Sequence, residues 1–201
     1  SVVNLHLAAQ KGRVLMALTF DYGQRAAKRE IKSAQFFCQK LKVPHQVIDL
    51  TWLKEVTKTA LVQRDQDLPE LKDLDDAKEG GESAKTVWVP NRNGVFINIA
   101  ASFAESLNAE FIVPGFNQEE AATFPDNSQA FIDAANGALS LSTMTHAKVK
   151  CFTTDLDKSE MVVKAKDLGV EFSHLWSCYR DGEKPCGYCE SCQRTARALK
   201  R

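Results

Sequence analysis

The chain has 201 residues, of which 26 are basic and 26 acidic, so its formal net charge at pH 7 is zero. This length predicts one domain with a small appendage, and it suffices for a hydrophobic core without disulfide staples. At 44% hydrophobic and 26% charged residues, the composition is typical of a folded globular protein and excludes the disordered and fibrous classes. Zero net charge argues against a protein that binds nucleic acid through a broad basic surface.

The hydropathy pattern of the chain predicts neither a membrane protein nor a secreted one. Its most apolar stretches, residues 14–20 and 95–104, are shorter than the ~18 to 20 residues of a membrane span. No basic leader with an apolar run and a cleavage site opens it, so we expect a cytoplasmic protein that binds no membrane. The apolar pattern that starts directly after Ser1 predicts a chain that begins at a helix, with an upstream strand missing.

Strand-like and helix-like stretches then alternate along the chain. Short apolar runs predict strands, whereas apolar residues recurring every three to four positions predict helices. Such alternation is typical of βαβ units, and it predicts an α/β fold with a parallel sheet. The charged segment 65–82, closed by Gly80 and Gly81, is expected to be a solvated excursion rather than a core element. The predicted strands are 14–20, 46–50, 86–89, 111–113 and 149–152, and the clearest predicted helices are 27–41 and 93–107.

Polar clusters follow three of these predicted strands. Residues 21–25 follow the first, 90–93 follow the run at 86–89, and Gly115 with Glu120 and Asp126 follows the run at 111–113. Ligands of open α/β sheets bind beyond the carboxyl ends of the strands. The clusters are therefore expected to meet in one crevice, where Arg25 and Arg92 would pair with phosphate or carboxylate oxygens.

Four of the six cysteines lie within 15 residues near the C-terminus, in the spacing C-x7-C-x2-C-x2-C. Four thiolates complete a tetrahedral zinc shell, and Gly187 helps the loop to turn around such an ion. Disulfides are one alternative, disfavoured by the expected reducing compartment. An iron–sulfur cluster is the stronger alternative, because C-x2-C-x2-C also occurs in ferredoxin-like sites. The predicted ligands are Cys178, Cys186, Cys189 and Cys192, whereas Cys38 and Cys151 are predicted to be core thiols.

Several of these stretches occur together in one known family. They are residues 19–25 (Thr-Phe-Asp-Tyr-Gly-Gln-Arg), 89–93, 115–126, 157–160 and 177–192, and they span nearly the whole chain in the family's order. The sequence resembles the 7-cyano-7-deazaguanine synthases of queuosine biosynthesis, which are PP-loop ATP-dependent ligases. The resemblance implies a Rossmann-like, adenine nucleotide alpha hydrolase-like fold with helices on both faces of the sheet, and structural zinc on the four cysteines.

The resemblance also implies an ATP site. The family's phosphate loop has the form Ser-Gly-Gly-x-Asp-Ser, and only Ser1 matches its last residue, so the 201 residues are expected to lack the first strand and the loop glycines. Amides at the start of a helix after Ser1 would face the ATP phosphates. We expect these 201 residues to bind ATP poorly and to be inactive by themselves. The residues assigned to ATP are Ser1, Val2, Val3, Asn4, Leu5 and Phe20.

The implied reaction joins ammonia to 7-carboxy-7-deazaguanine at the expense of ATP, with Mg²⁺, and gives the nitrile. Arg25 and Arg92 are the predicted catalytic residues, acting by positioning and charge neutralisation. Ala26, Asn91 and the pair at 122–123 depart from the family's usual residues, of which the one at position 91 is glycine, and this leaves the exact deazapurine open. The predicted substrate-binding residues are Asp21, Tyr22, Gln24, Asn93, Gly115, Glu120 and Asp126.

Two other functions remain open at this point. One is a PP-loop enzyme that modifies tRNA directly, for example by thiolation, with the cysteines carrying a cluster or sulfur. The other is a non-catalytic zinc-bearing binding module. The resemblance implies a homodimer with small-molecule substrates, and the zero net charge argues against a nucleic-acid partner. The resemblance divides the chain into a PP-loop domain at residues 1–172 and a zinc-binding segment at 173–201.

Overall fold

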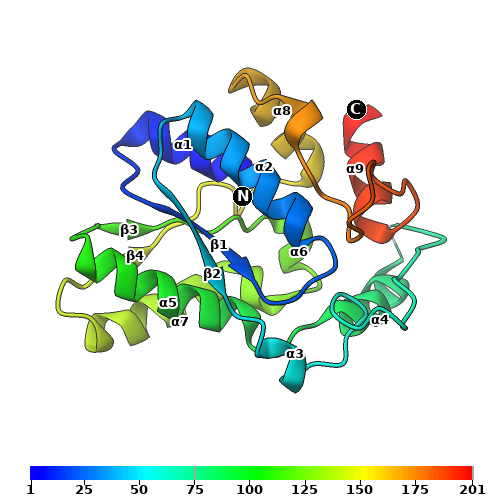
Figure 1. Cartoon of the computed structure of the whole chain (residues 1–201), viewed down its shortest axis with the longest axis horizontal. Coiled ribbons are helices and arrows are strands. Elements are labelled where there is room, and N and C mark those ends of the chain that lie inside the picture. The colour runs from blue at the N-terminus through cyan, green and yellow to red at the C-terminus, as the bar shows by residue number, and fades with distance from the viewer. Residues whose placement is uncertain (75, 201) are drawn as a thin grey trace. The chain divides into compact units, whose positions relative to one another are not determined.

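The computed structural model of the protein describes residues 1–74 and 76–200. Helices and short strands alternate along the chain, as Figure 1 shows. The helices are α1 Val2–Lys11, α2 Ala27–Lys40, α3 Leu53–Val56, α4 Ala77–Val87, α5 Arg92–Ser106, α6 Gln118–Ala121, α7 Gln129–Ser142, α8 Lys158–Asp167 and α9 Glu190–Lys200. The strands are β1 Ala17–Asp21, β2 His45–Asp49, β3 Phe111–Ile112 and β4 Lys148–Val149, and 3-10 turns span Pro125–Asn127 and Phe172–His174.

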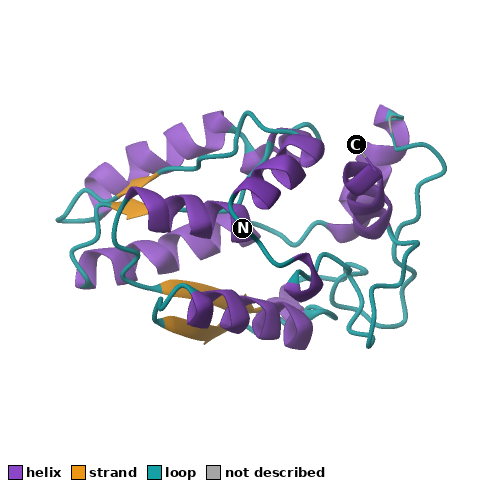
Figure 2. Cartoon of the chain, turned by 90° about the horizontal axis from the view of Figure 1, so that it is seen from above, coloured by secondary structure: helices purple, strands orange, loops and turns teal. Residues whose placement is uncertain are grey.

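The chain forms two compact units, which are described separately below. The first combines Ser1–Ala17 with Asn91–Val170, and the second combines Leu18–Pro90 with the chain from Glu171 onward. Each unit holds a two-stranded sheet, drawn in orange in Figure 2, β3–β4 in the first and β1–β2 in the second. The predicted division at residues 172 and 173 stays a prediction.

The core of the first unit lies where helices α5 and α7 pack against β3 and β4. The two strands are parallel, with Phe111 opposite Lys148 and Ile112 opposite Val149. The α5 residues that face this core, Ile97, Ala101 and Ala104, recur every three to four positions, so one helix face is buried. The parallel pairing and the flanking helices confirm the predicted α/β class.

The second unit is built around helix α2, whose Phe37 and Cys38 are almost completely buried. Strand β2 packs against this helix, and the helix occupies almost the predicted range of 27–41. The prediction that Cys38 is a core thiol is therefore confirmed. Cys151, in the first unit, is partly buried, and its thiol donates hydrogen bonds to the Asn4 side chain and the Phe116 carbonyl.

Two predictions for the middle of the chain are wrong. The expected strand at 86–89 overlaps the end of helix α4, which begins where the Asp76 side chain accepts hydrogen bonds from Lys78 N at 2.7 Å and Glu79 N at 3.1 Å. This cap satisfies amides at the start of the helix, so α4 forms despite the two glycines in its interior. The segment 65–82 is also not a purely solvated excursion, because Leu68 and Leu71 are buried.

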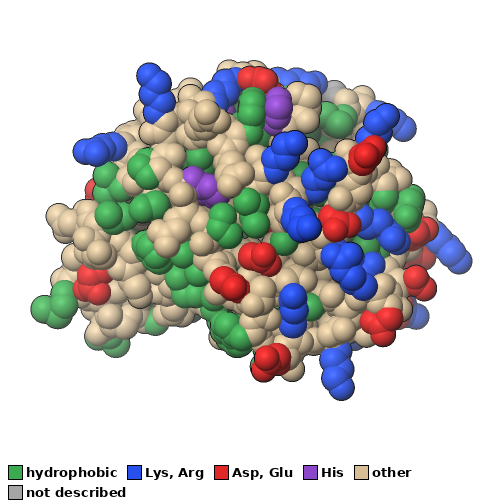
Figure 3. Space-filling view, in the orientation of Figure 1, with side chains coloured by type: hydrophobic (Ala, Val, Ile, Leu, Met, Phe, Trp, Pro, Cys, Tyr) green, Lys and Arg blue, Asp and Glu red, His purple; other side chains and the backbone are tan. Residues whose placement is uncertain are grey.

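Among the described residues, no helix combines the length and the apolar content that a membrane crossing requires. On the face drawn in Figure 3, acidic side chains stand among the lysine and arginine side chains.

Candidate functional site

The turn at residues 21–25 follows β1 and is closed by a hydrogen bond from Gly23 N to Asp21 Oδ1 of 2.9 Å. Gly23 adopts a left-handed backbone with φ of +82°, and a Cβ at this position would lie 1.8 Å from Lys54 Cε. Only glycine meets both conditions without strain or a shift of the lysine. The glycine therefore lets the Lys54 side chain lie directly against the turn.

Gln24 holds this turn from within. Its side-chain oxygen accepts a hydrogen bond from Tyr22 N at 3.0 Å, and its amide nitrogen donates to the Phe20 carbonyl at 3.1 Å and to Glu30 Oε2 at 2.7 Å. Gln24 and Tyr22 are both buried. Both ends of the Gln24 amide thus shape the turn, while the predicted substrate contacts of Tyr22 and Gln24 and the ATP contact of Phe20 stay predictions.

Arg25 is buried, and its guanidinium binds main-chain carbonyls of a neighbouring loop. One terminal nitrogen donates to Gln63 O at 2.5 Å and also to Gln66 O. The buried Nε has no hydrogen-bond partner among the described residues. Burial lowers the pKa of this guanidinium, and the nearby positive charges of Arg180 and Arg64 lower it further. Such a group gains from an added anion, which would supply the missing acceptor and offset the crowded positive charge.

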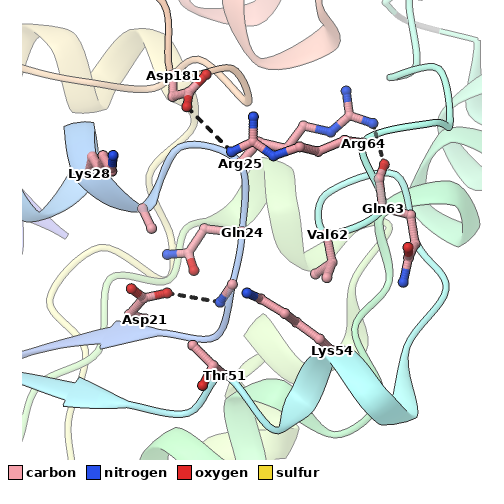
Figure 4. A pocket seen from close by; sticks show the side chains of 12 residues that line it. Asp21, Gln24, Arg25, Lys28, Thr51, Lys54, Val62, Gln63, Arg64 and Asp181 are labelled. Carbon is pink, nitrogen blue, oxygen red and sulfur yellow. Dashed lines mark hydrogen bonds and ion pairs between the residues drawn. The ribbon is translucent and has the colours of Figure 1, made fainter.

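A pocket of about 470 Å³ lies beside this turn (Figure 4). Four basic side chains line it against two acidic ones, so its lining favours an anionic ligand. Arg64 and Asp181 form an ion pair of 3.5 Å at its rim, with Arg64 largely exposed. The lining residues are Asp21, Gly23, Gln24, Arg25, Ala27, Lys28, Thr51, Lys54, Val62, Gln63, Arg64 and Asp181.

Three of these lining residues, Asp21, Gln24 and Arg25, are predicted from the sequence, whereas the other basic side chains are not. Lys28 could have been found, because it stands one helical turn after Gln24 at the start of α2. Lys54 and Arg64 come from separate segments with no motif of their own. Only the fold brings them beside the turn.

In the first unit, helix α1 begins directly after Ser1, as predicted. Ser1 occupies the N-cap position without a side-chain capping bond, and Leu5 N donates to Ser1 O at 3.0 Å. A Cβ on Gly115 would lie 2.5 Å from Ser1 Cα, so the missing side chain permits this close approach. Since the Leu5 amide is used inside the helix, the first-turn amides that remain are those of Val2, Val3 and Asn4.

The side chain of Asn4 is engaged in the core of the same unit. It is 1% exposed, its Nδ2 donates to Thr153 Oγ1 at 2.5 Å, and its Oδ1 accepts from Phe152 N at 2.9 Å. These bonds fix the first turn of α1 against the segment after β4. An ATP contact from Asn4 would therefore involve its backbone amide rather than its side chain.

Residues 91–93 start helix α5 beside Asp126. Asn91 has φ of +51°, a left-handed conformation that glycine adopts most readily and asparagine next, which explains why asparagine can stand at the family's glycine position. Asn93 Nδ2 donates to Asp126 O at 3.3 Å. Burial raises the pKa of the Asp126 carboxyl, while Arg92 and a hydrogen bond from the Asn127 side chain act against this rise.

Glu120 lies opposite Lys158, with Oε1 and Nζ 3.3 Å apart. Although burial acts to raise it, the pKa of the Glu120 carboxyl is held below its usual range by Lys158 and by a hydrogen bond from Asn117. Lys158 begins helix α8, where Asp157 and Glu160 form a reciprocal capping box. The motif at 157–160 thus builds a helix start and presents Lys158 to Glu120.

The four C-terminal cysteines form one cluster in the second unit. Their sulfurs all lie within 4.8 Å of one another, with 4.0 Å between Cys178 and Cys189 and 3.9 Å between Cys186 and Cys192. A tetrahedral zinc shell with Zn–S bonds of about 2.3 Å has sulfurs about 3.8 Å apart, whereas a disulfide joins sulfurs at about 2.05 Å. All six cysteines are free thiols. The cluster therefore fits a metal ion and has no disulfide.

Backbone amides donate hydrogen bonds to the sulfurs of Cys178 and Cys186, whereas burial raises the pKa of the Cys189 and Cys192 thiols. Cys178 Sγ accepts from Arg180 N at 3.3 Å and from Cys186 N at 3.4 Å. Burial opposes ionisation of Cys186, but amides of Cys189 and Tyr188 outweigh it and lower its pKa to about 7. Gly187, with φ of +84°, supplies the left-handed residue expected between these cysteines. The cysteine side chains are thus arranged as metal ligands rather than as core residues alone.

The predicted site residues therefore fall into a group in each unit. The second unit brings together Asp21, Gln24 and Arg25 at its pocket, and the four cysteines in their cluster. The first brings together Ser1 with Gly115, and Asn93 with Asp126. The meeting of Arg25 and Arg92 in one crevice stays a prediction.

Comparison with known proteins covers the whole chain. A family model described as "Queuosine biosynthesis protein QueC" matches residues 1–201. A protein of Pelotomaculum thermopropionicum, named 7-cyano-7-deazaguanine synthase, is 50% identical over all of this chain and 91% of its own length. Proteins of the same name from Carboxydothermus hydrogenoformans and Methanosarcina mazei are each 48% identical, over 98% and 100% of this chain and 92% and 89% of their own lengths.

Proposed function

Because the chain belongs to the QueC family of queuosine biosynthesis proteins, we propose that it is an ATP-dependent ligase that converts 7-carboxy-7-deazaguanine and ammonia to 7-cyano-7-deazaguanine. The observation that carries this proposal is the match over the entire chain, together with relatives named as synthases that it covers almost completely. The basic lining of the pocket at residues 21–25 supports it, because both proposed substrates of the activation step are anionic.

The chemistry requires that a carboxylate oxygen become a leaving group. Transfer of a phosphorus-containing group from ATP to that oxygen gives a mixed anhydride. Ammonia then attacks the carbonyl carbon and expels the activated oxygen together with the transferred group, which leaves an amide. A second transfer to the amide oxygen, followed by loss of that oxygen with its group and of the two N–H protons, gives the nitrile. Each step develops charge on oxygen atoms, so fixed basic groups lower its barrier.

In the second unit, Arg25 is the residue best placed to stabilise the negative charge that develops on these oxygen atoms. Its guanidinium is partly held by main-chain carbonyls, and its buried Nε lacks a partner among the described residues. We assign Arg25 and Lys54 to phosphate or carboxylate oxygens, and Asp21 to a hydrogen bond with the ring or with a sugar hydroxyl. Figure 4 shows these side chains around the same pocket.

In the first unit, the start of α1 and the residues around Asp126 provide complementary contacts. The free first-turn amides after Ser1 suit ATP phosphates. Arg92 suits an anionic oxygen, and Asp126 or Glu120 suits the paired N–H groups on the edge of a guanine-like ring. Asn93 and Gly115 hold these groups in place through the contacts described above.

We assign zinc to the four-cysteine cluster in a structural role. All four ligands are thiolate donors in a closed set, which is the composition of structural zinc sites. When bound, the ion would neutralise the thiolates and join the loop at residues 178–186 to the start of α9. A zinc protein is colourless, so a brown purified protein would indicate an iron–sulfur cluster instead. Mg²⁺ is proposed only as the counter-ion of ATP.

The resemblance also supports a homodimer in a reducing, cytoplasmic compartment. For a dimer, light scattering of the purified protein is expected to give a molar mass twice that of one chain. A mass of one chain over the working concentration range would contradict it.

Product analysis tests the enzymatic proposal directly. The protein, expressed from its complete gene, is incubated with 7-carboxy-7-deazaguanine, ammonium, ATP and Mg²⁺. The products are then separated and identified by mass spectrometry. The nitrile is expected only in the complete mixture and not when ATP or ammonium is left out. A folded, metal-loaded protein that forms neither amide nor nitrile would show that the proposal is wrong.

A further inference from the structure

One wall of the pocket is formed by the start of the segment at residues 61–71, which we call the wall segment. Val62, Gln63 and Arg64 line the pocket directly. The first half of the segment is fixed by Arg25, whose backbone N donates to Leu61 O at 2.8 Å and whose guanidinium donates to the carbonyls of Gln63 and Gln66. The shape of this wall thus depends on the turn at residues 21–25.

The other end of the wall segment is held by helix α9. Leu71 N donates to Gln193 Oε1 at 3.1 Å, and Gln193 Nε2 donates back to Leu71 O at 2.8 Å. Glu190 N donates to Pro69 O at 3.0 Å. Three hydrogen bonds therefore join two residues of α9 to Pro69 and Leu71, at the end of the wall segment.

Glu190 also reaches the helix that follows the wall segment. It is 5% exposed, and its carboxylate accepts a hydrogen bond from the hydroxyl of Ser83 in α4. Arg194 completes the group, with Nε 2.9 Å from Glu190 Oε1. A buried carboxylate with two such partners has a fixed position, so α4 and α9 are held at one point.

Glu190 and Gln193 stand among the metal ligands without being ligands themselves. Glu190 directly follows Cys189, and Gln193 directly follows Cys192, both in the first turn of α9. A helix of this length is marginal in isolation, and its first turn has the weakest hydrogen bonding. An ion bound to the cysteines on each side would hold this turn, and the two side chains with it.

We propose that Glu190 and Gln193 are positioning residues that couple the four-cysteine metal site to the pocket, so that metal loading fixes the wall segment and raises the affinity of the pocket for its anionic substrate. The substrate part of this inference rests on the proposed function, whereas the coupling of metal and wall does not. By linkage, a ligand that fixes the wall also raises the affinity of the cysteines for the metal by the same factor.

Limited proteolysis measures this coupling without any substrate. Trypsin cuts after Arg64 and Lys72, one inside the wall segment and one directly after it, and mass spectrometry resolves both cuts. With zinc bound, these bonds are expected to be protected. Removal of zinc by a chelator, with circular dichroism showing that the rest of the protein stays folded, is expected to speed both cuts about tenfold, and readdition of zinc to restore protection. Unchanged cutting after zinc removal would overturn the proposal.

Gln193→Ala separates the coupling from the metal itself. It removes both hydrogen bonds to Leu71 but no thiolate, so zinc content is expected to stay at the wild-type level while the two wall cuts become about tenfold faster. Gln193→Glu keeps the acceptor and loses the donor, and a smaller increase is expected. Gln35→Ala, on the exposed face of α2, is the matched control and should leave the cuts unchanged. If a Gln193 variant keeps its zinc and its two wall bonds are cut as slowly as in the wild type, the proposal is overturned. If Q193A loses zinc, the same comparison of cutting rates is made with Q193E.

Kinetics then connect the wall to the substrate. In an active enzyme, Q193A is expected to raise KM for 7-carboxy-7-deazaguanine about fivefold with a smaller change in kcat, because the variant alters the wall of the pocket and not the reacting groups. An unchanged KM in a variant with fast wall cuts would overturn the substrate part alone. Failure to form the nitrile at all concerns the proposed function, and the proteolysis results stand independently of it.

Discussion

The turn at residues 21–25 and the residues at 91–93 with Asp126 carry the same set of groups, used in different ways. Each has a left-handed residue, an arginine and a carboxylate. In the turn, the glutamine and the arginine bond to main-chain atoms, and the arginine is buried. Around Asp126, the charged side chains act on each other, since Arg92 opposes the rise in the pKa of the Asp126 carboxyl.

This difference indicates that an arginine in a sequence motif can serve the fold in one place and the chemistry in another. Arg25 fixes a second segment of chain and also lines the pocket, so its replacement should affect folding before it affects chemistry. Arg92 begins a helix next to a carboxylate, so its replacement should leave the fold largely intact. Substitutions at matched positions in the two regions can break or confirm this distinction.

The largest effect is expected for Arg25→Ala. The substitution removes the donor of two main-chain carbonyls in a buried site, and we expect the free energy of unfolding to fall by about 3 kcal/mol. Urea titration followed by circular dichroism measures the loss. Arg64→Ala is the control, because this largely exposed arginine forms an ion pair of 3.5 Å with Asp181 at the pocket rim, and it should change stability by less than about 0.5 kcal/mol. If the two variants lose the same unfolding free energy, Arg25 does not have the structural role assigned to it.

Arg92→Ala should show the opposite profile. We expect turnover to fall at least about tenfold, which corresponds to ~1.4 kcal/mol of transition-state stabilisation, with little change in the urea midpoint. Arg92→Lys keeps the charge but not the two-point geometry, so it should recover only part of the rate. Steady-state kinetics with all three substrates gives the comparison. Wild-type turnover in R92A would show that Arg92 lies outside the reacting site.

The two left-handed residues provide the next test. At Asn91, with φ of +51°, alanine should lower the free energy of unfolding by about 1 kcal/mol, whereas the family's usual glycine should be neutral or slightly stabilising. At Gly23, alanine should cost more than at Asn91, because its Cβ would also meet the Lys54 side chain. Urea midpoints of N91A, N91G and G23A establish the order. If N91A and G23A lose the same unfolding free energy, the contact of the new Cβ with Lys54 does not affect stability.

The sequence was most informative where the partners of a group lie close to it along the chain. The four cysteines lie within 15 residues, and two-residue spacing brings neighbouring thiolates together almost regardless of the rest of the fold. The helices at 27–41 and 93–107 were readable for the same reason, because their apolar periodicity is local. The capping box at Asp157 and Glu160 is also a local pattern.

Groups brought together from distant segments could not be read in this way. Lys54, Arg64 and Asp181 meet at the pocket from three separate stretches, and no spacing rule connects them. The wrong strand at 86–89 has a related cause. Its short apolar run suits a strand as well as the end of a helix, and the decisive feature was the Asp76 cap ten residues earlier.

The smallest effect is expected for Asp126→Asn, and its pH dependence tests the charge balance around Arg92. Because burial raises the pKa of this carboxyl in the folded protein, the folded state binds a proton more tightly than the unfolded state does. Between the unfolded pKa near 3.9 and the higher folded pKa, the unfolding free energy of the wild type therefore falls as pH rises, and it stays lower at neutral pH.

Asparagine cannot ionise and keeps an acceptor for the Asn127 side chain, whose Nδ2 lies 3.0 Å from Asp126 Oδ1. D126N should therefore gain stability relative to the wild type as pH rises from about 3 to about 7, by about 0.5 kcal/mol, and urea titrations at several pH values measure the difference. A relative loss over that range would mean that the attraction of Arg92 outweighs burial. The two side chains would then form a stabilising ion pair, and the contrast with the turn at residues 21–25 would disappear.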